Sequence, residues 1–268
     1  MANYLEETRT LLWMGTVLYG LAFIFALASL ILERHYSRMI FYTLLVGGFF
    51  FQGIGLYLRG LTFFALPLTN PMEIVQVISW SSMLLILMVQ MSFRLVLLGF
   101  FGTAMSTILG LLSLSIAGWD YPNLASSFAN PWIEFHAALA IFAYGVFGIL
   151  AINALMYLLQ HYGLTHKRFG GLFALLPSLQ QLDDLMTRLL LMGVTVFTVA
   201  LFLGTLTWVS DYKSVSFHTL VYSWVLWISY FSILILKEKK RWMSRNVGWA
   251  CLILFLFVLV SLWPIHTY

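Results

Sequence analysis

Two histidines lie inside strongly apolar segments of this chain, where their side chains could act as ligands. His136 and His218 fall about five and about two residues into the segments 131–160 and 216–236. At about 1.5 Å per helical residue, both imidazoles lie within about 8 Å of the starts of their helices. Ionisable groups inside a membrane span are costly and usually functional. Two neutral imidazoles at one level would suit axial ligation of haem iron.

The residues around the two histidines could enclose a flat cofactor. Trp132 lies one turn before His136 on the same helical face, and small residues follow that histidine at helical spacing. Tyr222 and Trp224 would form an aromatic wall near His218. A purely structural interpretation is also open, with histidines bonded to backbone or headgroups and the aromatic residues forming an interfacial belt. A zinc site would need three or four ligands, and the spacing here fits no zinc motif.

A second polar group precedes the third apolar segment. Asn70 is placed to cap a helix, and Glu73 would then lie in its first turn, where a negative charge suits the helix dipole. The functional alternative is that Glu73 and Arg59 orient the carboxylate of a ligand or hold its pocket closed. We predict no catalytic residue.

The elements that must position these residues are membrane helices. The chain has 268 residues, of which 62% are hydrophobic and 9% charged, and its mean hydropathy is +0.93. So few charges exclude a water-soluble globular protein, and the long unbroken apolar runs argue against a β-barrel and against disorder. We predict an all-α, polytopic membrane protein, a single domain over residues 1–268, with eight spans near residues 11–32, 39–58, 74–92, 95–116, 131–160, 185–209, 216–236 and 247–264.

Basic residues are distributed asymmetrically between the predicted loops. The odd-numbered loops, counted with Arg188 at the start of the next span, hold eleven of them, and the termini with the even-numbered loops hold three. This asymmetry predicts that both termini face outward and that the odd loops face the cytoplasm. The basic cluster 237–245 is either a plain topology signal or a lipid-attracting segment. In the loop 161–184 we expect a turn and a short interfacial helix.

Four segments with distinct motifs, residues 67–80, 136–144, 176–183 and 218–227, resemble the cytochrome c assembly family, which is CcsA-related, and are closest to its shorter YpjD and HemX-type members. The resemblance extends from about Arg59 to Trp263. Two of the segments contain the histidines, one a His-x₇-Tyr helix and the other a histidine helix followed by tryptophans. The other two are a Pro-x-x-Asn-x-x-Glu segment followed by a tryptophan and a Leu-Pro-x-Leu lead into a helix.

The resemblance implies that His136 and His218 are external ligands of a non-covalent, b-type haem. Arg59 and Glu73 would then be supporting or propionate-side groups. One departure is the outer loop 210–215, which is much shorter than the tryptophan-rich loop of the haem-delivering members.

The resemblance predicts a haem-handling protein of c-type cytochrome assembly in a bacterial inner membrane, performing no covalent step itself. Its partners would be lipid, haem and other maturation proteins or an apocytochrome, and no nucleic-acid-binding motif is present. One alternative is a regulatory or assembly scaffold without haem. Another is a small-solute transporter, for which the deep polar candidates are Gln52, Gln90 and Asn153.

Overall fold

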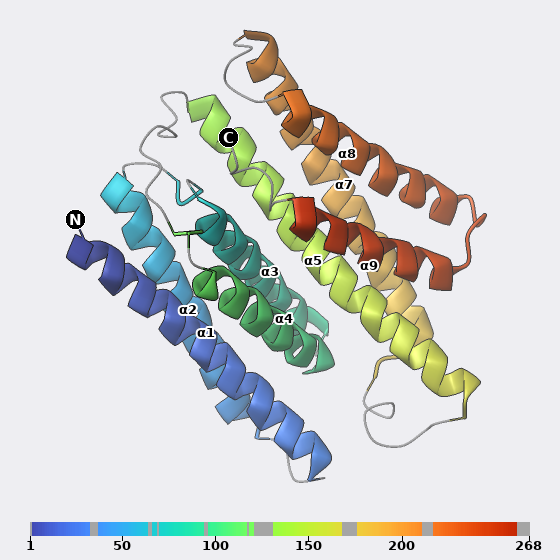
Figure 1. Cartoon of the computed structure of the whole chain (residues 1–268). Helices are drawn as coiled ribbons and strands as arrows, with labels where there is room; N and C mark the ends of the chain where they lie inside the picture. Colours follow the sequence, from blue (N-terminus) through green and yellow to red (C-terminus); the bar gives the residue numbers. More distant parts are fainter. Residues whose placement is uncertain are drawn as a thin grey trace. The chain divides into compact units, whose positions relative to one another are not determined.

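The computed structural model of this chain is all-helical over the residues that it describes, namely 2–32, 37–63, 66–68, 70–93, 96–116, 118–120, 131–167, 176–210 and 217–261. Those residues form eight helices and no strands, which confirms the predicted all-α class (Figure 1). The helices are α1 (Ala2–Ile31), α2 (Arg38–Phe63), α3 (Pro71–Phe93), α4 (Val96–Ser115), α5 (Pro131–Thr165), α7 (Leu179–Ser210), α8 (Phe217–Glu238) and α9 (Ser244–Ser261).

The lengths and composition of these helices suit a bilayer. In the described part of the chain, seven helices are long and apolar enough to cross a membrane, and α9 is a shorter apolar helix. A helix needs about 20 apolar residues to span the hydrocarbon core. The chain is therefore a polytopic membrane protein.

Local side-chain caps define where two of the helices begin. Asn70 Oδ1 accepts a hydrogen bond from the Glu73 backbone nitrogen at 2.9 Å, so the predicted cap of α3 is present. Ser178 and Gln181 form a reciprocal capping box at the start of α7, with both bonds at 3.3 Å. Because of this box, α7 begins at Leu179, about two turns before the predicted span.

The prediction of a separate interfacial helix in the loop 161–184 is wrong for its polar run 180–184, which forms the first turns of α7. Residues 161–165 of that loop form the end of α5, and residues 168–175 lie outside the described residues.

The helices divide into two compact units. Unit 1 contains α1 to α4, and unit 2 contains α5, α7, α8 and α9. In unit 1, α1 packs against α2 and α4, and α3 packs against α2 and α4. In unit 2, α5 packs against α7 and α9, and α8 packs against the same two helices. Each unit is thus a closed ring of four helices, and the prediction of one domain stays a prediction.

Glycines and aromatic rings set the close contacts within each unit. In unit 1, a Cβ at Gly48 would come within 2.8 Å of the Tyr19 ring, so only glycine lets α1 and α2 approach this closely. In unit 2, the Phe147 and Tyr230 rings stack with centroids 3.8 Å apart and planes 2° apart. This stack joins α5 directly to α8 in the core of unit 2.

Candidate functional site

His136 lies half-buried in the second turn of α5, against α7. Its Nδ1 is 2.6 Å from the backbone oxygen of Ala200. A carbonyl oxygen only accepts hydrogen bonds, so Nδ1 is the donor, and Nε2 of the neutral ring keeps its lone pair. One turn further along α7, a Cβ at Gly204 would lie 2.9 Å from both ring nitrogens. The ring is therefore oriented by one hydrogen bond and fits against a glycine.

The second candidate ligand, His218, lies in the first turn of α8, and its side chain is outside the described residues. Two contacts between α5 and α8 give the position of its backbone along the helix axis relative to His136. One is the stack of Phe147 on Tyr230, and the other is the hydrogen bond between the Tyr144 and Ser223 side chains.

Both contacts place the two histidine positions at similar heights. The helices α5 and α8 run in the same direction, because the residue numbers increase on both helices from the pair Tyr144–Ser223 to the pair Phe147–Tyr230. His136 is 11 residues before Phe147, and His218 is 12 before Tyr230. The two positions therefore differ in height by about one residue, or about 1.5 Å. Counting instead from Tyr144 and Ser223 gives three residues, or about 4.5 Å.

The three aromatic residues expected to line the site lie on exposed faces of unit 2. Trp132, Tyr222 and Trp224 are 62%, 50% and 40% exposed. Trp224 packs edge-on against Trp227, at a centroid distance of 5.7 Å. Trp227 in turn donates a hydrogen bond from Nε1 to Thr198 on α7, at 2.7 Å. The described part of unit 2 therefore leaves these three side chains accessible from outside.

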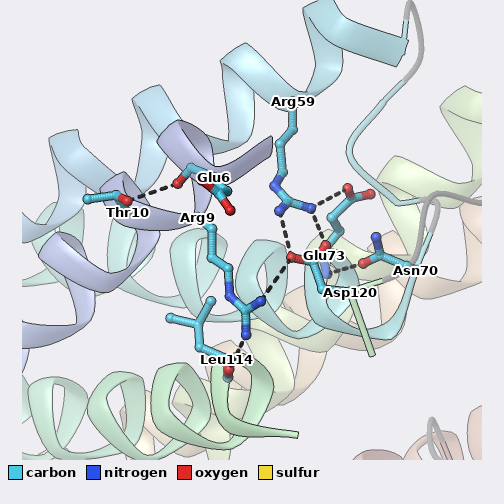
Figure 2. Close-up of polar contacts among 8 residues, drawn as sticks. All are labelled: Glu6, Arg9, Thr10, Arg59, Asn70, Glu73, Leu114 and Asp120. Carbon is cyan, nitrogen blue, oxygen red and sulfur yellow. Dashed lines mark hydrogen bonds and ion pairs between the residues drawn. The ribbon is translucent and has the colours of Figure 1, made fainter. Parts of the chain in front are cut away.

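Arg59 and Glu73 are fully buried in unit 1 and contact each other (Figure 2). Arg59 Nη1 donates to Glu73 Oε1 at 3.1 Å. The same guanidinium binds Asp120 through two bonds, of 2.8 and 2.9 Å. Arg9 lies 3.9 Å from Asp120 and donates to the Leu114 carbonyl at 2.9 Å. We call Arg9, Arg59, Glu73 and Asp120 the ion cluster.

Besides Arg9, the ion cluster contains a second residue that was not selected from the sequence, Asp120. It follows α4, and it is 61 positions from Arg59, so no local spacing links the two. The available signal was the topology, which places Arg59, Glu73 and Asp120 on the same predicted outer side. Both terminal nitrogens of Arg59 bind carboxylates of Glu73 or Asp120, whereas its buried Nε has no hydrogen-bond partner among the described residues. The ion cluster belongs to unit 1 and both histidines belong to unit 2.

Deep polar residues of both units hold helices together. Gln52 donates to Gln76 Oε1 at 2.6 Å and accepts from the Tyr19 hydroxyl at 3.0 Å. Gln76 donates to Ser113 at 2.9 Å, so this network joins α1, α2, α3 and α4. In unit 2, Asn153 donates to the Leu182 carbonyl at 2.8 Å. These bonds fit helix packing, the role that such residues more often have than solute transport.

Comparison with known proteins supports the resemblance seen in the sequence. A family profile described as "Cytochrome C assembly protein" matches residues 68–264, which is more than half of the chain. The chain is also similar to Protein HemX of Brevibacillus brevis, with 30% identity over 138 residues. That match covers 52% of this chain and 51% of the relative, so it spans about half the length of the curated protein. Both candidate histidines and Glu73 fall within the profile match, and Arg59 precedes it.

Proposed function

Since this chain belongs to the cytochrome c assembly protein family, we propose that it binds haem during c-type cytochrome biogenesis, with His136 and His218 as the axial ligands. The family implies the role in biogenesis. The ligand assignment, the non-covalent b-type haem and a bacterial plasma membrane location are our proposal. A client apocytochrome or another maturation protein would be the partner. The protein would bind and present haem and would make no covalent bond itself.

The observation that carries this proposal is the common height of the two histidine positions. If haem binds here, His136 and His218 would hold it together, and positions at similar heights on two helices of unit 2 would allow both to reach one iron. The contact between Phe147 and Tyr230 gives a difference of about one helical residue, or about 1.5 Å, and the contact between Tyr144 and Ser223 gives about 4.5 Å. A single pair at one level suits one haem near one membrane surface.

The surroundings of His136 fit an iron ligand. Ligating histidines usually donate their other ring N–H to a carbonyl or carboxylate, which fixes the tautomer and the orientation of the ring. Ala200 supplies that carbonyl here. Gly204 lets the ring lie close to the α7 backbone. When bound, haem would supply the iron and its redox chemistry, and the protein would hold and orient it.

Absorbance spectra of the detergent-purified full chain, oxidised and reduced, with a pyridine haemochrome assay, test the proposal. We expect a Soret band and sharp reduced bands, with haem occupancy at least halved in His136→Ala and in His218→Ala. His166→Ala is a matched control, because His166 is exposed and also has Nδ1 on a backbone carbonyl, at 3.0 Å. Its spectrum should match the parent.

Two results would contradict the ligand assignment. One is unchanged haem occupancy in both single variants. The other is a colourless protein that takes up no added haem, which would favour the regulatory or assembly scaffold.

A further inference from the structure

The turn between α8 and α9, residues 239–243, has an unusual helix end. The Arg241 nitrogen bonds to the Leu236 carbonyl and the Lys240 nitrogen to the Lys237 carbonyl, both at 2.9 Å. This is a Schellman motif, whose left-handed position is usually glycine. Here Lys240 takes that position with a φ of 51°. A residue other than glycine is uncommon in this left-handed conformation, and among the described residues Lys167 is the other non-glycine residue that adopts it.

This turn is strongly basic and exposed. Lys239, Lys240, Arg241 and Arg245 all have exposed side chains. In the described part of the chain, none of these four forms an ion pair. Lys237 differs, because its side chain is 8% exposed and it pairs with Asp183 on α7. Four cations therefore remain available at the surface.

Apolar side chains lie beside these cations. Trp242 is 40% exposed and Met243 is 69% exposed. The turn joins two apolar helices and so lies at the surface of the membrane. Exposed tryptophan is typical of that interface, and clusters of lysine and arginine there attract anionic lipid headgroups.

The turn is also held in place by the rest of unit 2. On one side, the ion pair of Lys237 with Asp183 fixes the end of α8 to α7. On the other side, Gly248 of α9 packs near the backbone oxygen of Ala154 on α5. The basic side chains therefore project from a fixed backbone, which lowers the conformational cost of binding a ligand.

We propose that the exposed turn 239–243, with Arg245, is a binding site for the headgroup of an anionic phospholipid such as phosphatidylglycerol. Lys239, Lys240 and Arg241 would contact the phosphate, and Trp242 and Met243 would lie against the acyl region. This proposal does not depend on haem binding. It differs from a plain topology signal, because it requires these positions in particular.

The test uses the full chain in neutral detergent, titrated with short-chain phosphatidylglycerol and, separately, with phosphatidylcholine of the same acyl length. Bound lipid is counted by native mass spectrometry, and the unfolding midpoint is followed in parallel. We expect tighter binding of phosphatidylglycerol, weakened by added salt. Lys240→Gly should weaken it about fivefold without lowering the unfolding midpoint, because glycine relieves the left-handed backbone.

The chain offers two matched controls. Lys167 also ends a helix with a positive φ, of 54°, so Lys167→Gly removes an equivalent lysine elsewhere. The double variant Lys239→Gln with Arg241→Gln is compared with a second double variant, Arg38→Gln with Arg188→Gln. The second variant removes the same number of charges from other exposed positions. The controls should bind phosphatidylglycerol like the parent. Equal binding of both lipids, or equal weakening in the controls and the turn variants, would overturn the proposal.

Discussion

Arg59 is the residue on which the stability of unit 1 most depends electrostatically. Its guanidinium and the Glu73 carboxylate both have 0% exposed side chains. Removing one partner of a buried ion pair leaves an uncompensated buried charge. Arg59→Met should therefore lower the free energy of unfolding by about 3–5 kcal/mol, measured as the unfolding midpoint in detergent. Arg59→Lys should also be destabilising, because lysine cannot bind Asp120 through two parallel bonds.

Arg9 provides the matched control for this prediction. Its side chain is 43% exposed and lies 3.9 Å from Asp120, and an exposed pair of this kind contributes about 0–1 kcal/mol. Arg9→Gln should therefore shift the midpoint little. Adding Glu73→Gln to Arg59→Met should recover part of the loss, since it removes the stranded charge. A midpoint that is equally low for Arg9→Gln and Arg59→Met would show that the bidentate contact is not what matters.

At the scale of elements, the contact of α5 with α7 controls His136. A Cβ at position 204 would overlap the imidazole ring, so Gly204→Ala must push α7 away or turn the ring out of its hydrogen bond with Ala200. We expect a lower unfolding midpoint and, if haem is bound, at least a twofold loss of occupancy. Gly248→Ala is the control, because its nearest neighbour would be at an ordinary contact of 3.4 Å. Equal midpoints and spectra for the two variants would contradict this account of the ring's position.

The sequence predicts elements better than it predicts their ends. Each helix corresponds to an apolar run in the sequence, and such a run can be recognised without knowledge of the tertiary structure. The start of α7 could not be recognised in this way, because the residues of its first turns, 180–184, are polar and were predicted to belong to a loop. Those turns are stabilised by the capping box of Ser178 and by contacts with residues distant in sequence, such as Asn153 with the Leu182 carbonyl.

The candidate site could also be predicted only in part from the sequence. The order and spacing of motifs across 59–263 identified the family, which the profile match over 68–264 confirms. The similar depth of the two histidines was also a prediction from sequence, and the contact of Phe147 with Tyr230 supports it. Asp120 was not predictable, since an ion pair across 61 residues depends on how the four helices of unit 1 pack together.

At the scale of the whole molecule, each terminus lies on one side of the membrane. The side on which the C-terminus lies depends on whether α9 crosses the membrane. Eight crossings return the C-terminus to the side of the N-terminus, whereas seven would not. α9 has 18 residues, so it is about 27 Å long, close to the hydrocarbon thickness of about 30 Å. We therefore expect α9 to cross and both termini to face outward, as the distribution of basic residues also predicts.

Cysteine labelling of intact cells measures this directly, because the native Cys251 is 0% exposed and gives little background. Ala2→Cys and Tyr268→Cys should each react with a membrane-impermeant maleimide before permeabilisation. Lys239→Cys, on the predicted cytoplasmic side, should react only afterwards. If Tyr268→Cys reacted only after permeabilisation while Ala2→Cys reacted before, α9 would not cross. The basic turn 239–243 would then still lie on the cytoplasmic side, because seven crossings precede it. The lipid site and the position of α9 are therefore separate questions, and each has its own outcome.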